Sequence, residues 1–387
     1  MLKGNFPVEK FASLKTPFYY YDMGLLARTL EALRAELARY PDYRMHYAVK
    51  ANFNPEILKQ IAAAGLGADC VSGGEVQAAL DAGFAPESIV FAGVGKADWE
   101  INLALDARIG RFNVESLPEL EVLDSLAAAK GVKASISLRV NPDIGAHTHA
   151  NITTGLAENK FGINYDILEE VIRRALALEN VVFKGLHFHI GSQILEMDDF
   201  IALCNRVNEL SERLSRHGLP VGDINVGGGL GIQYQHPNHF PIADFATYFA
   251  TFKKHLAVKP GTPVHFELGR SIVAPCGSLI CRVLYVKQGT SRQFAIVDGS
   301  MTELIRPALY KAYHRIENLS SDEPEEVYDV VGPVCESSDV FAKAVELDRC
   351  HRGDFIAIRS AGAYGEAMAS RYNLHALPEA YYDWRQN

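Results

Sequence analysis

Residues that could do chemistry stand at or near the ends of short apolar runs in this sequence. Lys50 closes the run "HYAVK", and Glu267 lies near the end of "PVHFELG". His189 lies near the end of a third run, and the glycines at 227–229 end a fourth. Lysine is rarely buried without a partner, so Lys50 is either a solvated strand end or an amine kept for a reaction.

The combination of these residue types favours one cofactor. A glycine run lets backbone N–H groups approach a phosphate, and Ser192 could donate a further hydrogen bond, although an ordinary turn would explain either feature alone. A lysine amine can bind an aldehyde, and Glu267 can keep a pyridine nitrogen protonated, which makes the ring a strong electron sink. Together these groups predict a site for pyridoxal phosphate.

A metal site is the alternative chemistry. His187 and His189 alternate along one run, and metal-dependent barrel hydrolases often carry such a pair. Such enzymes also need His or Asp ligands at other strand ends, where this sequence has lysine, arginine, glycine and glutamate. His147 and His149 form a second pair inside a polar loop, where we expect them to face solvent. We therefore expect no metal.

Groups so far apart in the chain must be brought together by the fold. Eight β-rich runs alternate with helical patterns over the first two thirds of the sequence. This alternation predicts a (β/α)8 TIM barrel, in which chemistry lies at the C-terminal ends of the strands. An open doubly wound sheet is the alternative, which alternation alone does not exclude. The eight runs lie at 45–50, 68–72, 88–93, 111–116, 135–141, 183–191, 223–229 and 263–269.

The pattern changes near residue 270. Strand-like runs such as "SLICRVLYVKQ" and "DFIAIRSAGAY" then follow one another with little helix between them, which predicts a mostly antiparallel β domain. The early run "TPFYYYD" also has the pattern of a strand. We therefore expect an N-terminal segment, 1–25, that joins the C-terminal domain, a cofactor-binding barrel, 26–270, and a C-terminal β domain, 271–387.

Composition excludes several classes of partner. The 387-residue chain has 38 Lys and Arg against 47 Asp and Glu, and this net charge of -9 argues against nucleic acid and anionic membranes. No apolar run is long enough to span a bilayer, and the N-terminal stretch lacks the apolar core of a signal peptide. Six scattered cysteines without a CxxC pair indicate reduced thiols, so we expect a cytoplasmic protein.

With these residues assembled, the chain resembles the fold-type III pyridoxal-phosphate decarboxylases. The similar blocks are "YAVKAN", "GADCVSGGE", "ENKFGI", "GLHFHIGSQ" and "VGGGLGI". A further block, "ELGRSIVA", resembles one usually written EPGR, with Leu268 in place of the proline. Three C-terminal blocks, "DGSMTELIRPALYKAYH", "VVGPVCESSDVFA" and "AGAYGEAMASRYN", resemble the diaminopimelate branch more than the ornithine or arginine branches.

The resemblance implies a role for each matching residue. The implied catalytic residues are Lys50, which binds the cofactor aldehyde as a Schiff base, His189, which stacks on the ring, and Cys335, which returns a proton to the α-carbon. The implied cofactor contacts are Lys50, Arg139, His189, Ser192, Gly227, Gly228, Gly229, Glu267, Gly269, Arg270 and Tyr364. The implied substrate contacts are Arg270, Arg306, Tyr310, Glu336 and Tyr364.

The activity implied by the resemblance is decarboxylation of meso-2,6-diaminopimelate to L-lysine, in a homodimer whose subunits share their active sites. An arginine such as Arg306 matches the distal carboxylate, and a glutamate such as Glu336 matches the distal ammonium. The near alternative is a decarboxylase of ornithine, arginine or carboxynorspermidine. A racemase of similar fold is disfavoured by Glu267, and a non-catalytic cofactor carrier is disfavoured by the long C-terminal domain.

Overall fold

The computed structural model describes residues 3–142 and 160–385, so the loop with His147 and His149 lies outside the described residues. The chain divides into two compact units. The barrel unit comprises Leu30–Gly231 and Asp244–Gly269. The β unit comprises Met1–Thr29, Ile232–Ala243 and Arg270–Asn387. Within the described ranges, no helix is long and apolar enough to cross a membrane.

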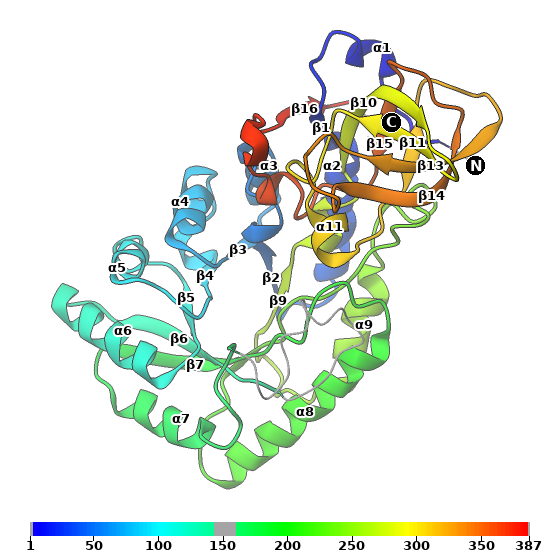
Figure 1. Cartoon of the computed structure of the whole chain (residues 1–387). Helices are drawn as coiled ribbons and strands as arrows, with labels where there is room; N and C mark the ends of the chain where they lie inside the picture. The colour runs from blue at the N-terminus through cyan, green and yellow to red at the C-terminus, as the bar shows by residue number, and fades with distance from the viewer. Residues whose placement is uncertain (1–2, 143–159, 386–387) are drawn as a thin grey trace. The chain divides into compact units, whose positions relative to one another are not determined.

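A closed barrel of parallel strands forms the barrel unit, which confirms the predicted (β/α)8 architecture. The alternation of strand and helix can be followed in Figure 1 from blue to green. The barrel strands are β2 (Tyr43–Ala48), β3 (Gly67–Cys70), β4 (Ile89–Phe91), β5 (Arg111–Val114), β6 (Ala134–Arg139), β7 (Val181–His187), β8 (Asp223–Asn225) and β9 (Val264–Leu268). The helices are α2 (Met23–Leu37), α3 (Pro55–Ala63), α4 (Gly73–Asp81), α5 (Asp98–Asp106), α6 (Leu117–Lys130), α7 (Leu168–Ala177), α8 (Met197–Arg216) and α9 (Phe245–His255).

Local sequence explains where several barrel helices begin and end. The side chains of Asn54, Ser72 and Ser116 accept hydrogen bonds from the first turns of α3, α4 and α6. Such side-chain caps satisfy N–H groups that have no partner inside the helix. Gly131 ends α6 with a φ of 65°, a conformation that glycine adopts without strain.

The barrel strands end earlier than the sequence patterns predict. Lys50 lies in a short 3-10 helix, η1 (Val49–Ala51), because the ladder of β2 ends where Ala48 pairs with Asp69. His189 lies two residues beyond β7, and the glycines at 227–229 follow β8 instead of ending it. Apolar composition continues into the loops at this rim, so it does not mark the end of hydrogen-bonded pairing.

Polar side chains recur at a period of two on several barrel strands, among them β5, β8 and β9. Each of these strands carries two of them, and residues two apart on a strand share a face. The pairs are Arg111 and Asn113 on β5, Asp223 and Asn225 on β8, and His265 and Glu267 on β9. The first members of two pairs form an ion pair across the barrel, in which Arg111 Nη2 lies 2.7 Å from Asp223 Oδ2.

The β unit is built on a mostly antiparallel sheet, as predicted. Its strands are joined in the order β12-β15-β10-β11-β13-β14. In addition, β1 pairs with β10 in antiparallel fashion, and β16 pairs with β1 in parallel fashion. The strands are β1 (Phe18–Asp22), β10 (Gly277–Gln288), β11 (Gln293–Val297), β12 (Ile316–Asn318), β13 (Glu325–Val331), β14 (Val340–Asp348), β15 (Phe355–Ile358) and β16 (Glu379–Asp383). The short helices include α1 (Val8–Phe11), α10 (Arg270–Val273), α11 (Arg306–Tyr310) and η5 (Tyr372–Leu374).

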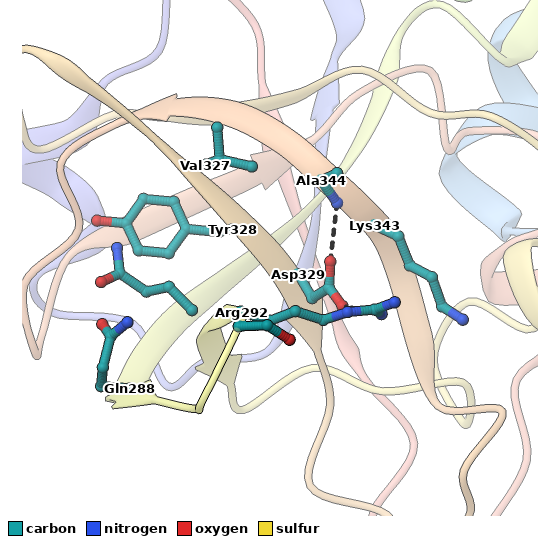
Figure 2. Close-up of a pocket in the computed structure, with 9 residues that line it drawn as sticks. Gln288, Arg292, Val327, Tyr328, Asp329, Lys343 and Ala344 are labelled. Carbon is teal, nitrogen blue, oxygen red and sulfur yellow. Dashed lines mark hydrogen bonds and ion pairs between the residues drawn. The ribbon is translucent and has the colours of Figure 1, made fainter.

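A shallow groove of about 500 Å³ crosses the β unit beside β13 and β14 (Figure 2). Two of its three charged side chains are paired, because Arg292 Nη1 lies 3.0 Å from Asp329 Oδ2, and the third is Lys343. The second oxygen of Asp329 accepts a hydrogen bond from the backbone N–H of Ala344, drawn as a dashed line in Figure 2. None of the residues that the sequence singled out for chemistry lines this groove.

Candidate active site

A cavity of about 360 Å³ in the barrel unit collects four of the predicted residues, Lys50, Arg139, His189 and Glu267. Its volume falls in the range of small-molecule sites. The cavity also contains residues that the sequence analysis did not select for the site. These are Asp69, Val71, Ala92, Gly93, Val94, Gly95, Phe161 and His187.

The turn that carries Lys50 packs closely against the end of β9. A Cβ atom on Gly269 would lie 2.9 Å from Cβ of Ala51 and 3.1 Å from Cβ of Ala48. Side chains do not approach each other this closely, so any residue larger than glycine would push the Lys50 turn outward. The absence of a side chain at Gly269 thus allows the Lys50 turn to pack directly on the end of β9.

Glu267 lies at the centre of a buried hydrogen-bond network. Glu267 is 6% exposed. Oε1 accepts hydrogen bonds from Nδ2 of Asn225 at 2.7 Å and from Nδ2 of Asn113 at 3.2 Å, while Oε2 lies 3.0 Å from Nε2 of His187. These donors favour the ionised carboxylate.

Two carboxyl groups in this cavity have opposite pKa shifts. Burial would raise the pKa of Glu267, but the charge and hydrogen bond of His187, with smaller effects from His189 and His46, lower it. Burial and the negative charge of Glu267 raise the pKa of Asp69 well above its usual value. Oδ1 of Asp69 has no hydrogen-bond partner in the described part of the chain. The network therefore selects Glu267 as the ionised group.

The glycine turn after β8 lies directly against His189. Gly227 has a φ of 72°, and a Cβ atom there would lie 2.8 Å from Nδ1 of His189. The backbone N–H of Gly228 donates to the same nitrogen at 3.3 Å, and a Cβ on Gly228 would collide with the carbonyl oxygen of Glu267. Burial, together with the cations Lys50 and Arg139, holds the pKa of His189 well below its usual value, so the ring is neutral.

Ser192 lies in a loop that runs beside the glycine turn. The backbone N–H of Ile194 donates to the carbonyl of Gly229 at 2.9 Å, and the N–H of Gly231 donates back to Ile194 at 2.9 Å. Gly229 has a φ of 110°, and a Cβ on it would lie 3.0 Å from the carbonyl oxygen of Gly191. The two segments predicted to bind phosphate are therefore neighbours.

Arg139 is held by a second buried glutamate. Its Nη1 lies 2.8 Å from Oε1 of Glu115, and its guanidinium lies over the ring of Phe161, 4.7 Å from the centroid. Glu115 also accepts hydrogen bonds from the backbone N–H groups of Gly93 and Gly162. The guanidinium is therefore fixed at the edge of the cavity.

The donor set of this cavity fits pyridoxal phosphate. An amine, an ionised carboxylate and a neutral imidazole lie together, and the glycine turn at 227–229 lies directly against the imidazole. A phosphate needs free approach to backbone N–H groups, and a pyridine ring needs a carboxylate for its nitrogen and a flat group to stack on. Within the described residues, no group of three His, Cys, Asp or Glu side chains could hold a metal ion.

A second cluster of predicted residues lies within the β unit. Arg270, at the start of α10, is 5% exposed, donates from Nη1 to the hydroxyl of Tyr234 at 2.7 Å, and lies 4.9 Å from the ring centroid of Tyr364. Tyr364 has a φ of 56°, an uncommon conformation for a bulky side chain. Burial would raise the pKa of Tyr234, but Arg270 and Arg306 lower it.

Arg306 belongs to the same cluster. It begins α11, which ends at Tyr310, and its guanidinium lies 5.2 Å from the ring centroid of Tyr234. Its Nη1 lies 2.8 Å from Nε2 of His314, whose Nδ1 lies 2.8 Å from the carbonyl of Arg359 and must donate to it. Burial, and the positive charge of Arg270, lower the pKa of Arg306. Two buried guanidinium groups near one tyrosine favour an anionic ligand.

Cys335 and Glu336 lie on an exposed turn of the β unit. The backbone N–H of Cys335 donates to Oδ1 of Asn373 at 3.1 Å, and the hydroxyl of Tyr372 donates to Oε1 of Glu336 at 3.0 Å. Asn373 and Leu374 have φ values of 52° and 60°, and Leu374 is 96% exposed. This turn is therefore anchored by hydrogen bonds within its own unit, while Cys335 and Glu336 remain exposed.

Sequence reasoning missed the residues that support Glu267. Asn113 and Asn225 each follow an apolar residue in "RFN" and "DIN", just as Glu267 follows one in "HFE". This shared period of two was the available signal, but its register around the barrel was needed to bring the three side chains together. His187 was considered as a metal ligand, whereas its Nε2 contacts Glu267.

Comparisons with known proteins agree with this chemistry. Residues 24–274 match the family model for the pyridoxal binding domain of pyridoxal-dependent decarboxylases. The chain is 62% identical over 380 residues to diaminopimelate decarboxylase from Bacteroides thetaiotaomicron, with 98% of each covered. A mutant of diaminopimelate decarboxylase from Helicobacter pylori, complexed with L-lysine, has a TM-score of 0.91 and 39% identity, covering 97% of this chain and 93% of that one. The enzyme from M. jannaschii, also with L-lysine, has a TM-score of 0.89 and 33% identity, covering 97% and 89%.

Proposed function

Because this chain belongs to the pyridoxal-dependent decarboxylases and, within them, to the diaminopimelate decarboxylases, we propose a role for each residue of its two clusters. The enzyme converts meso-2,6-diaminopimelate to L-lysine and carbon dioxide, the last step of lysine biosynthesis, with pyridoxal 5′-phosphate as cofactor. The barrel cavity that collects Lys50, His189 and Glu267 is the observation that supports these roles. Ornithine, arginine and carboxynorspermidine are not favoured as substrates, because the full-length relatives are diaminopimelate decarboxylases.

The barrel residues hold the cofactor. When bound, pyridoxal phosphate supplies a ring that takes up the electron pair left on the α-carbon as carbon dioxide departs. The Lys50 amine would hold the cofactor aldehyde, and the Glu267 carboxylate would keep a proton on the ring nitrogen. The neutral imidazole of His189 would offer a face for the ring, and Arg139 would contact its phenolic oxygen.

The phosphate is bound by backbone and side-chain donors. The glycine turn at 227–229 binds it through the N–H of Gly229, because the N–H groups of Gly227 and Gly228 donate to Asn225 and His189. The hydroxyl of Ser192 also donates to it, and the proximity of these two segments supports the assignment. Gly269, Arg270 and Tyr364 complete the proposed cofactor contacts. We propose that the cofactor-binding domain spans 26–270, between segments 1–25 and 271–387. The family match at 24–274 and the pairing of β1 with β10 support this division.

The arginines of the β unit provide substrate selectivity. Arg306 and Tyr310 bind the distal carboxylate of diaminopimelate, Arg270 and Tyr364 contact its reacting end, and Glu336 binds the distal ammonium. Ornithine and lysine lack the distal carboxylate and would leave buried guanidinium groups without an anion. A site with such unpaired groups rejects an analogue strongly.

The last step is proton return. Cys335 donates its thiol proton to the α-carbon after carbon dioxide has left, so the product amino acid forms with the proton supplied by the protein. Cys335 and Glu336 are both exposed, which supports a homodimer in which each subunit completes the active site of the other. Five of the six cysteines are buried thiols, and this supports a reducing, cytoplasmic location.

Cofactor attachment and substrate-specific carbon dioxide release test the proposal together. The purified protein should be yellow, borohydride reduction should fix the cofactor on Lys50, and carbon dioxide should be released from diaminopimelate but not from ornithine or lysine. A protein that stays colourless with added pyridoxal phosphate contradicts the cofactor assignment. Release from ornithine at a comparable rate contradicts the proposed substrate contacts.

Subunit mixing tests the shared active site. Lys50→Ala and Cys335→Ala should each be nearly inactive alone. Mixed after reversible dissociation, they should recover about a quarter of wild-type activity, because half of the dimers are mixed and each mixed dimer has one intact site. Mixtures that recover no activity contradict the sharing of residues between subunits.

A further inference from the structure

We propose that Asn225 is a positioning residue that couples the carboxylate of Glu267 to the glycine turn at 227–229. Through this one side chain, the group assigned to the ring nitrogen and the group assigned to the phosphate are held in a common geometry. The inference rests on the proposed function of both groups.

Three hydrogen bonds close a ring around Asn225. Its Nδ2 donates to Oε1 of Glu267 at 2.7 Å, and its Oδ1 accepts from the backbone N–H of Gly227 at 2.9 Å. The backbone N–H of Glu267 then donates to the carbonyl of Gly227 at 2.8 Å. Asn225 is 1% exposed, so water does not compete for these bonds.

The chemistry of the partners fixes the orientation of the amide. The backbone N–H of Gly227 can only donate, so the atom facing it must be the amide oxygen. The ionised carboxylate of Glu267 can only accept, so the atom facing it must be the amide nitrogen. Exchange of the two atoms would break both bonds, and Asn225 therefore specifies both neighbours at once.

The same bonds determine which oxygen of Glu267 is left for a ligand. A carboxylate has about four acceptor directions, two on each oxygen. Oε1 uses both of its directions for Asn225 and Asn113, while Oε2 uses one for His187. The remaining direction lies on Oε2, and Glu267 and His187 both line the cavity.

Asn113 provides a matched control within the same network. It is also buried and donates to Oε1 of Glu267, at 3.2 Å. Its Oδ1 has no hydrogen-bond partner in the part of the chain that the structure describes, and it makes no described hydrogen bond to the glycine turn. Asn113 therefore acts on the carboxylate alone, whereas Asn225 acts on the carboxylate and the turn.

The test compares binding of pyridoxal phosphate and pyridoxal to the apoenzyme by titration calorimetry, with circular dichroism to check folding. The dissociation constant of pyridoxal divided by that of pyridoxal phosphate measures how much the phosphate group adds to binding. Asn225→Ala should weaken both ligands and lower this ratio about tenfold, the effect of losing a hydrogen bond that orients a charged ligand. Asn225→Asp puts a second carboxyl beside the Glu267 carboxylate, whose charge keeps the new group protonated, so it still accepts from Gly227 and donates to Glu267. It should bind both ligands nearly as the wild type does and leave the ratio unchanged.

Asn113→Ala is the matched control, and in the same assay it should weaken the binding of both ligands equally. An unchanged ratio in Asn225→Ala overturns the coupling, and so does a ratio in Asn225→Asp that falls as far as in Asn225→Ala. If Asn225→Ala does not fold, Asn225→Leu, which has a similar shape and neither polar atom, takes its place in the same comparison. A wild-type apoenzyme that binds neither ligand contradicts the proposed function itself.

Discussion

The two glutamates assigned to the active site are held in opposite ways. Glu267 is 6% exposed and has hydrogen-bond partners on three other strands of the barrel. Glu336 lies exposed on a turn of the β unit and accepts a hydrogen bond from the hydroxyl of Tyr372. The first carboxylate is organised entirely within one unit of one chain.

This difference indicates two ways of preparing charge for catalysis. Buried donors stabilise the Glu267 carboxylate in surroundings of low dielectric constant, where the electrostatic effect of a charge is large. An exposed carboxylate such as Glu336 interacts weakly with ligands until another surface excludes water. The barrel is therefore organised for cofactor chemistry by a single chain, whereas the exposed Cys335 turn fits the proposal that a second copy completes it.

The largest expected effect tests the exposed side of this comparison. Cys335→Ala should keep the cofactor bound but lower kcat about 10²- to 10⁴-fold, the usual contribution of a proton donor. Absorbance of the bound cofactor and carbon dioxide release measure the two effects separately. Ser337→Ala, on the same exposed turn, should leave both unchanged. Full activity in Cys335→Ala would remove its role as proton donor but not the family assignment.

The next effect tests the buried side. Glu267→Gln keeps the shape of the side chain but removes its charge, and should lower kcat about 10²- to 10³-fold through lost electrostatic stabilisation. The absorbance of the bound cofactor should also change, because the proposed carboxylate partner of its ring nitrogen is lost. Asp223→Asn, which neutralises a carboxylate on the neighbouring strand β8, should lower the melting temperature without this spectral change. Equal spectral changes in both variants would contradict a specific role for Glu267.

The sequence predicted the barrel and the main residues of its cavity because both depend on local patterns. Strand and helix periodicity and the residue types after each strand are readable without a structure. The support of Glu267 was not predictable in this way, since Asn113, Asn225 and His187 come from three different strands. Their meeting depends on strand register, which no local pattern specifies.

The structure differs from the sequence prediction at Gly269 and at residues 232–243, and both differences have a physical cause. Gly269 was assigned to the cofactor, and its described close contacts are with Ala48 and Ala51, a consequence of packing that a single glycine does not reveal. Residues 232–243 follow the seventh predicted strand, yet they group with the β unit through contacts distant in sequence. Tyr234, which contacts Arg270 and Arg306, was missed for this reason.

Acid stability distinguishes the deeper layer of the barrel from surface positions. Burial lowers the pKa of His46 to about 3, below its usual value of 6.5. Between these values the unfolded chain binds a proton that the folded chain does not, so stability falls as pH falls through this window. His46→Asn should reduce that slope by about 1.4 kcal/mol per pH unit, measured by urea unfolding between pH 4 and 6. The exposed His239→Asn should leave it nearly unchanged, and an unchanged slope in His46→Asn would contradict a buried neutral histidine.

The smallest effect concerns the support of Glu336. Tyr372→Phe removes only the hydroxyl that donates to this carboxylate, and the bond lies on an exposed surface in the single chain. Loss of one hydrogen bond of ordinary strength should raise KM for diaminopimelate about two- to tenfold. The change should leave the affinity for pyridoxal phosphate and the cofactor spectrum as in the wild type, because Tyr372 and the barrel network share no described hydrogen bond. An increase in KM of a hundredfold or more would show that Glu336 is as strongly organised by Tyr372 as Glu267 is by its buried donors, and the proposed contrast between the two glutamates would then be wrong.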